Sequence, residues 1–317
     1  MDTQVACIGV GNVGRAWAIA FARGGHRVRL FDTEQTALER SLVQIATSLD
    51  DLQSALLVDD ADAILARIDT CASMEQALTG TDHVQESVIE DIEIKRQLFA
   101  EMDALAAPGC VLASSSSEFM SSEFVGDTKN PQRCLVAHPF NPPHLIPLVE
   151  ICGHPGTDPS VVQRTRELFE RIGMSPVVVN REVKAFLLNR LQAAVVGEAM
   201  HLVGEGYCSA EDLDRAMSDG LGLRWSFMGP FMTGHLNASG GYREYMRTFG
   251  DTYRRMCADL STNYPFDLQL IDRVSGDMEK TFPADRIAEG QRWRDQRLID
   301  LLRHKQTAAA PATDTDA

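Results

Sequence analysis

Short runs of apolar and β-branched residues alternate with longer helical patterns through the first half of the chain. Val5 to Ile8 predicts a strand, and an apolar helical pattern follows from about Arg15 to Arg23, ended by Gly24-Gly25. The alternation continues, with strand-like runs at His26–Phe31, Asp82–Val88, Cys110–Ala113, Cys134–His138, Leu148–Ile151 and Ser175–Val179 and helical patterns at Glu34–Leu56, Asp91–Leu105 and Asp158–Ile172. Strands that alternate with helices predict an α/β fold, in which helices cover both faces of a doubly wound, mostly parallel sheet.

The pattern changes near residue 183, where the strand-like runs largely end. Ala185 to Val203 is one long helical stretch, and the rest of the chain is helical, broken by glycine-containing turns. We therefore expect two domains, a sheet domain over residues 1–183 and a smaller all-α domain over residues 184–305. The last stretch, residues 306–317, is small, polar and acidic, and we expect it to be disordered.

The charge balance excludes several classes of function. The chain has 317 residues, with 30 Lys and Arg against 45 Asp and Glu, so its net charge is −15. Nucleic-acid binding needs a basic surface, so we expect no nucleic-acid partner. No apolar run approaches the ~20 residues of a membrane helix, and the first residues do not resemble a signal peptide. The seven cysteines form no C-x-x-C pair, which favours a reducing, cytoplasmic setting.

A glycine-rich turn lies between the first predicted strand and helix. Gly9-Val10-Gly11-Asn12-Val13-Gly14 has the form G-x-G-x-x-G, and in this context the motif binds a dinucleotide pyrophosphate at the helix N-terminus. Asp32 ends the second strand, where a carboxylate can bind the adenosine ribose. Together with Glu34 it would repel a 2′-phosphate. The sequence thus predicts a Rossmann-type domain that binds NAD rather than NADP.

A histidine and a glutamate lie in the strand-rich segment that follows. His138 begins the run His-Pro-Phe-Asn-Pro-Pro, and Glu150 comes twelve positions later. Oxidation of an alcohol needs a base for the hydroxyl proton, and a neutral histidine suits that task near pH 7. A carboxylate behind the ring would fix its tautomer and stabilise the imidazolium. The spacing alone leaves a purely structural role for both residues equally open.

A metal site is an alternative interpretation of the same segment. Cysteine and histidine cluster there in sequence, at Cys134, His138, His144, Cys152 and His154. Their spacings do not match the C-x₂₋₄-C or H-x₃₋₅-H patterns of zinc sites, so we predict no metal.

Taken together, these motifs resemble the 3-hydroxyacyl-CoA dehydrogenase superfamily over nearly the whole chain. The resemblance is carried by the glycine turn, Asp32, the serine run 114–117, the histidine run and Asn189-Arg190. Within the superfamily the chain is most similar to the L-gulonate 3-dehydrogenase branch, which includes lambda-crystallin. That similarity lies in residues 188–192, 212–214, 220–224, 229–230, 235–238 and 292–295.

The resemblance implies a role for each matching residue. His138 would be the base and Glu150 its partner, Ser117 would hydrogen-bond the reacting oxygen, and Asn189 would hold substrate and nicotinamide against the histidine. Three further positions would line the NAD site: Glu90, Lys95 and Asn141. The superfamily also forms dimers through the helical domain, so we expect a homodimer.

The chain departs from the superfamily pattern at several positions. Asn-Thr-Ser is usual where this chain has Ser115-Ser116-Ser117, Glu118 replaces a small or neutral residue, and Ala185 stands where glycine is common. These departures leave the chemistry intact but put the substrate in doubt.

The substrate class follows from charge. Coenzyme A carries several phosphates and needs cations, yet the first lysine of the chain is Lys95. Residues 32–62 hold one base, Arg40, and eight acids, Asp32, Glu34, Glu39, Asp50, Asp51, Asp59, Asp60 and Asp62. This segment favours a small free acid, L-gulonate, over a CoA ester. Arg224 could bind its carboxylate bidentately, although a structural salt bridge is an equal alternative.

Three other functions stay open. A 3-hydroxyacyl-CoA dehydrogenase would share the chemistry. A carnitine dehydrogenase would need an aromatic cage for the quaternary ammonium, and Trp225, Phe227, Phe231 and Tyr242 could supply one, although core packing explains them as well. A non-catalytic, crystallin-like NAD-binding protein is the third, and the presence of the whole set of Ser117, His138, Glu150 and Asn189 argues against it.

Overall fold

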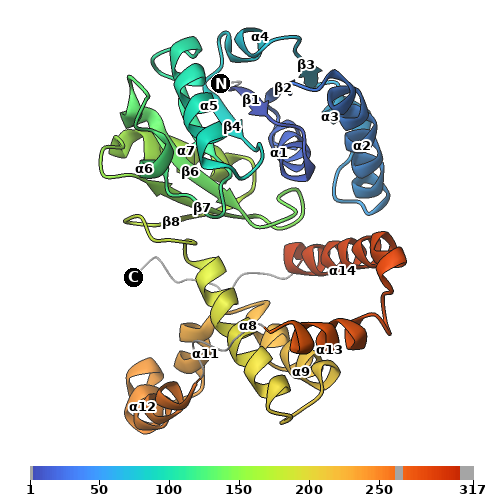
Figure 1. The fold of residues 1–317 in the computed structure, drawn as a ribbon, viewed down its shortest axis with the longest axis vertical. Coiled ribbons are helices and arrows are strands. Elements are labelled where there is room, and N and C mark those ends of the chain that lie inside the picture. Colours follow the sequence, from blue (N-terminus) through green and yellow to red (C-terminus); the bar gives the residue numbers. More distant parts are fainter. Residues whose placement is uncertain (1–2, 261–266, 308–317) are drawn as a thin grey trace. The chain divides into compact units, whose positions relative to one another are not determined.

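The computed structural model describes residues 3–260 and 267–307 (Figure 1). Its internal contacts divide the chain into one compact unit of residues 1–189 with 293–317 and a second unit of residues 190–292. The predicted boundary at 183/184 falls just before this division. Residues 293–305, which the sequence pattern places in the helical domain, group with the first unit. Residues 308–317 of the predicted tail lie outside the described residues.

The first unit is built on one eight-stranded sheet, counted over the described residues. Its strands lie in the order β3-β2-β1-β4-β5-β6-β7-β8, and every neighbouring pair is parallel except the antiparallel pair β6 and β7. The bounds are β1 Gln4–Ile8, β2 Arg27–Phe31, β3 Ile68–Thr70, β4 His83–Glu86, β5 Val111–Ser114, β6 Cys134–Pro139, β7 Leu148–Gly153 and β8 Ser175–Val178. The predicted mostly parallel sheet is confirmed. The pattern misses β3 because only Ile68 of its three residues is buried.

Helices connect these strands as the pattern predicts. Those of the first unit are α1 Asn12–Arg23, α2 Gln35–Ser54, α3 Ala61–Leu65, α4 Met74–Leu78, α5 Ile92–Leu105, α6 Ser121–Phe124 and α7 Pro159–Arg171, with a 3₁₀ turn at Pro131–Arg133. Helix α1 begins earlier than predicted, since Asn12 and Val13 of the glycine turn form its first turn. The aspartates Asp60, Asp91 and Asp158 cap α3, α5 and α7 through their side chains, which explains where these helices start.

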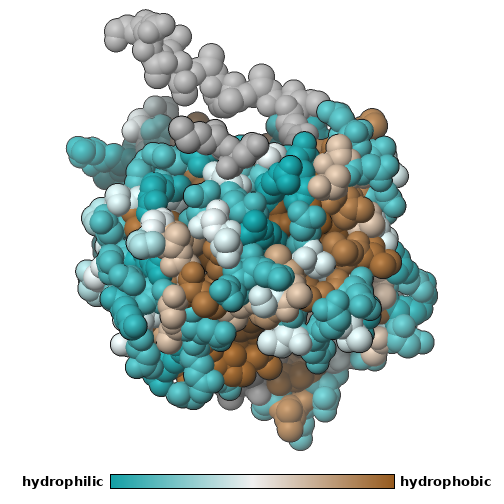
Figure 2. Space-filling view, turned by 90° about the horizontal axis from the view of Figure 1, so that it is seen from above, coloured by the Kyte–Doolittle hydropathy of each residue, from teal (hydrophilic) through white to brown (hydrophobic). Residues whose placement is uncertain are grey.

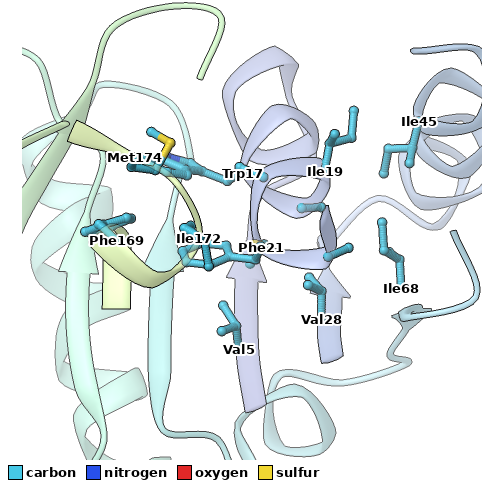
Figure 3. Packing of buried hydrophobic residues seen from close by; sticks show 14 of the residues in the cluster. Val5, Trp17, Ile19, Phe21, Val28, Ile45, Ile68, Phe169, Ile172 and Met174 are labelled. Atoms are coloured by element: carbon cyan, nitrogen blue, oxygen red, sulfur yellow. The ribbon is translucent and has the colours of Figure 1, made fainter. Parts of the chain in front are cut away.

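Both faces of the sheet are buried. Val5 and Cys7 of β1 join one apolar cluster, while Ala6 and Ile8, which point the other way, join a second cluster. The first cluster includes Trp17, which stacks on Phe21 of the same helix at 5.5 Å between ring centroids and lies 5.2 Å from Phe169 of α7 (Figure 3). Because the sheet is covered on both sides, polar side chains that bind ligands or take part in a reaction are expected at the ends of its strands.

All regular elements described in the second unit are helical. They are α8 Leu188–Gly204, α9 Ala210–Ala216, a π-helical turn Met217–Gly222, α10 Leu223–Trp225, α11 Pro230–Leu236, α12 Gly241–Asp259 and α13 Leu268–Met278. A 3₁₀ turn, Ala284–Arg286, leads into α14 Ile287–Thr307, whose Ile299 is buried in the first unit's core. The predicted start of a helix at Ala185 is wrong: Ala185 and Phe186 have φ of 63° and 52°, so α8 begins at Leu188.

The surface agrees with the composition. On the face seen in Figure 2, hydrophilic residues predominate and hydrophobic ones gather in smaller areas between them. None of the helices in the described part of the chain is long and apolar enough to cross a bilayer.

Candidate active site

The glycine turn provides the space that a dinucleotide needs. A side chain on Gly9 would lie 2.6 Å from the carbonyl oxygen of Ser87, and one on Gly14 would lie 1.9 Å from that of Gly9. By contrast, nothing lies within 4 Å of a Cβ placed on Gly11, the residue that caps α1. The turn is therefore closed toward the sheet and open at the helix N-terminus, where the N–H groups of Asn12 and Val13 could hold a pyrophosphate.

Asp32 is held in place by this turn. One of its carboxylate oxygens accepts the N–H of Val10 and the other accepts the N–H of Glu34, each at 3.0 Å. A cavity of about 580 Å³ beside it is lined by Gly9, Gly11, Asp32 and Glu34, together with Phe31, Val88 and Ile89 among others. The carboxylate keeps lone pairs for ribose hydroxyls, and a second acid lies nearby. These residues fit the adenosine half of NAD.

The antiparallel pair β6 and β7 brings His138 and Glu150 together. The two residues lie directly opposite each other across the strands, and His138 Nδ1 lies 2.9 Å from Glu150 Oε2. A carboxylate can only accept, so Nδ1 carries the proton and Nε2 of the neutral ring is left as an acceptor. Both side chains are buried. The sequence spacing could not show this register, because it depends on the antiparallel return of β7.

Glu150 also binds the backbone that leads into α8. Its Oε1 accepts the N–H groups of Leu187 at 2.8 Å and Leu188 at 3.1 Å. Burial acts to raise the pKa of Glu150, but the hydrogen bonds from His138 and from these two N–H groups outweigh it and hold the pKa below its usual range. Glu150 therefore stays ionised and can stabilise a protonated histidine.

An ion cluster, buried at Lys95 and Glu86 and open to solvent at Glu90, holds the loop after β5. Lys95, 1% exposed, donates to both carboxylate oxygens of Glu86 at 2.9 and 3.1 Å and lies 3.5 Å from Glu90. Glu86 accepts the hydroxyl of Ser114, and Glu90 accepts the hydroxyl of Ser116 and the N–H of Glu118. Burial acts to raise the pKa of Glu90, but Ser116, Lys95 and Glu118 lower it overall. Glu90 thus holds both neighbours of Ser117, through the hydroxyl of Ser116 and the N–H of Glu118.

Six of the predicted residues meet in one cavity: Val13, Glu90, Lys95, Ser117, His138 and Asn141. A space of about 280 Å³ is lined by Val13, Ser87, Val88, Glu90, Lys95, Ser115, Ser117, His138, Pro139 and Asn141. Ser87 and Val88 also line the larger cavity beside Asp32, so the two spaces adjoin and an elongated cofactor can extend through both. Asn189 lies at the edge of this group, with its Nδ2 3.5 Å from the carbonyl oxygen of Ser117.

Arg224, the predicted partner of the substrate carboxylate, lies on α10 in the second unit, and it is exposed. In the same unit Phe231 is 73% exposed and meets Tyr242 edge to face at 5.9 Å. Within the described residues, no group of three or more His, Cys, Asp or Glu side chains could hold a metal ion.

Sequence reasoning missed several residues that support the site. Ser115 Oγ accepts the indole N–H of Trp17 at 3.0 Å and the amide of Gln85 at 2.7 Å, and it lies 2.9 Å from Ser87 Oγ. Glu86 was also missed, although a charged residue at the end of a buried strand is a usable signal. Phe186 stacks on His138, and its position follows from a backbone turn that the helical pattern hides.

Comparisons with known proteins agree with this geometry. The family model for the 3-hydroxyacyl-CoA dehydrogenase NAD binding domain matches residues 4–183, and that for the C-terminal domain matches residues 186–265. Lambda-crystallin from Oryctolagus cuniculus is 39% identical over 308 residues, which cover 96% of each chain. An L-carnitine dehydrogenase/betainyl-CoA thioesterase from Rhizobium meliloti (strain 1021) is 33% identical over 95% of this chain and 60% of its own length.

A solved structure extends the similarity to the fold of the whole chain. It is a 5-formyl-3-hydroxy-2-methylpyridine 4-carboxylic acid 5-dehydrogenase, described as an NAD⁺-dependent dismutase. It is 26% identical, with a TM-score of 0.83, and the match covers 98% of this chain and 100% of that one. The nucleotide turn, the acid after β2 and the N-terminal family model all indicate one cofactor, NAD. The chain therefore belongs to the 3-hydroxyacyl-CoA dehydrogenase family of NAD-dependent oxidoreductases, which act on CH–OH groups.

Proposed function

We propose that the protein oxidises the 3-hydroxyl of a small hydroxy acid, L-gulonate, to 3-dehydro-L-gulonate. The observation that carries this proposal is the His138–Glu150 pair at the wall of a cavity that adjoins the nucleotide turn. His138 Nε2 takes the hydroxyl proton while the carbon–hydrogen bond breaks and the carbonyl forms. NAD, when bound, supplies the acceptor for the hydride.

The surrounding residues have distinct tasks in this proposal. Ser117 donates a hydrogen bond to the reacting oxygen, and Asn189 positions the substrate from the first turn of α8. Glu90, Lys95 and Asn141 line the nicotinamide half of the cofactor site. Glu150 keeps His138 in the tautomer with a free Nε2 and stabilises the positive ring that results.

Charge supports a small free acid over a CoA ester. Of the eight acids in residues 32–62, seven are exposed, and they lie on or beside α2 and α3. The phosphates of coenzyme A would be repelled by this surface. The similarity to lambda-crystallin supports the same branch of the family. Arg224 stays a proposed partner for the substrate carboxylate.

The test follows NAD reduction by absorbance with L-gulonate, L-carnitine and L-3-hydroxybutyryl-CoA at saturating NAD. We expect kcat/KM to be highest for L-gulonate and lowest for the CoA ester. A preference for the CoA ester would overturn the argument from the acidic segment. A preference for L-carnitine would instead favour a cage formed by the exposed aromatic residues near Arg224. NAD binding without turnover of any of the three would leave a crystallin-like role.

We also propose that the helical unit forms a homodimer. Apolar side chains on α12 are exposed at alternating spacings of four and three residues, which places them on one helix face: Tyr242, Met246, Phe249, Tyr253 and Met256. A stripe of this length on a surface helix is typical of an interface. Sedimentation should give twice the monomer mass, and Met256→Glu should give monomers. A wild-type monomer at micromolar concentration would contradict the proposal.

A further inference from the structure

The backbone just before α8 is strained. Ala185 and Phe186 both have positive φ, 63° and 52°, and Phe186 N–H closes the turn on the carbonyl of Val183 at 3.0 Å. A left-handed conformation is unfavourable for residues with a Cβ and rare for bulky ones. Two in succession persist only where the surroundings over-determine them, and such strain is concentrated at functional sites.

The turn contacts both members of the catalytic pair. The ring of Phe186 stacks on the imidazole of His138, with centroids 5.3 Å apart and planes inclined by 25°. The next two residues, Leu187 and Leu188, donate their N–H groups to Glu150. His138 is thus held at its Nδ1 edge by the carboxylate and across its face by an aromatic ring. Phe186 itself is fully buried.

We propose that Phe186 is a positioning residue that orients the His138 ring and stabilises its protonated form during substrate oxidation. This inference rests on the proposed function, in which the substrate O–H bond breaks, a proton joins Nε2 and hydride leaves the carbon for NAD. The face of a phenyl ring is electronegative, so it attracts an imidazolium more strongly than a neutral imidazole. Because the contact is buried, little water competes with that attraction.

The charged groups beside His138 lie on other segments than Phe186. They include Glu150 on β7, bonded to Nδ1, and Glu90 and Lys95, which line the same cavity. A change in the pH dependence of turnover can therefore be assigned to the ring face, provided that the fold is intact.

The test is the pH profile of kcat/KM for L-gulonate oxidation, or for whichever substrate proves best. The histidine must be neutral to accept the proton, so activity falls on the acid side. Phe186→Leu keeps an apolar side chain and removes the π face. In this variant we expect the acid limb of the profile to shift to lower pH by roughly half a unit. The plateau should fall about twofold to fivefold, since the imidazolium forms in the transition state. Phe99→Leu, at a buried ring that packs on Phe124, controls for the loss of an aromatic core residue.

An isosteric series keeps the inference testable if the leucine variant folds poorly. Phenylalanine with one and then three ring fluorines, incorporated at position 186, keeps its shape while the ring face becomes less negative. We expect the acid limb to move down stepwise along the series. An acid limb that stays in place in both tests, with the wild type active, would overturn the role of Phe186. Absence of turnover in the wild type would instead contradict the proposed function.

Discussion

At the scale of single residues, His138 is the proposed base. Its Nδ1 is bonded to Glu150 and its ring lines the cavity, so substitution should affect proton transfer more than cofactor binding. We expect His138→Asn to lower kcat by about 10²–10⁴-fold, the usual contribution of a general base. The dissociation constant for NADH, measured by fluorescence, should change little. Wild-type activity in this variant would remove His138 from the mechanism.

Glu150 links the catalytic pair to stability. Its folded pKa lies below its usual range, so its contribution to the free energy of unfolding is present above about pH 4.3, the ordinary glutamate value, and is lost as pH falls through the lower folded pKa. In Glu150→Gln the urea midpoint should be lower than that of the wild type at pH 7. The difference between the urea midpoints of the two proteins should narrow as pH falls below 4. A gap that is independent of pH would show that the carboxylate charge does not matter.

At the scale of elements, the turn before α8 offers a stabilising substitution. Ala185 has a φ of 63°, a conformation that glycine adopts without steric cost. Against this gain, glycine makes the unfolded chain more flexible and so loses more conformational entropy on folding. The difference between these effects predicts that Ala185→Gly raises the free energy of unfolding by about 0.5–1 kcal/mol. Thermal unfolding checks this, with Ala210→Gly in a helix as the destabilising control. A lower midpoint for Ala185→Gly would show that the alanine methyl group makes contacts that outweigh the strain.

The elements also show what the sequence could predict. Strands such as β1 and β5 were predictable because their buried runs are apolar, and the Gly9–Gly14 turn because Gly9 and Gly14 leave no room for a side chain. The register that places His138 opposite Glu150 was not, since it depends on a strand that returns antiparallel through a loop. Nor was the left-handed turn at Phe186, because its apolar residues continue the helical pattern of α8.

At the scale of the whole molecule, net charge should govern how substrates arrive. The chain has a net charge of −15, so a negatively charged hydroxy acid approaches against a repulsive field. Salt shortens the range of that field to about 8 Å at physiological ionic strength. We expect kcat/KM for L-gulonate to rise between low and physiological salt, while that for zwitterionic L-carnitine changes little. Equal responses of the two substrates would indicate that local charges in the site dominate.

The double use of Glu150 has a consequence for observing the enzyme at work. One oxygen of the carboxylate faces the ring that gains and loses a proton, while the other accepts the amide hydrogens of Leu187 and Leu188. When the ring becomes positive, electron density of the carboxylate shifts toward it, and the hydrogen bonds from the N–H groups of Leu187 and Leu188 weaken. Deuterium uptake at these amides should therefore report the protonation state of the catalytic pair. The rate of deuterium uptake at the start of α8 would then change with each step of the reaction in which the histidine gains or loses a proton.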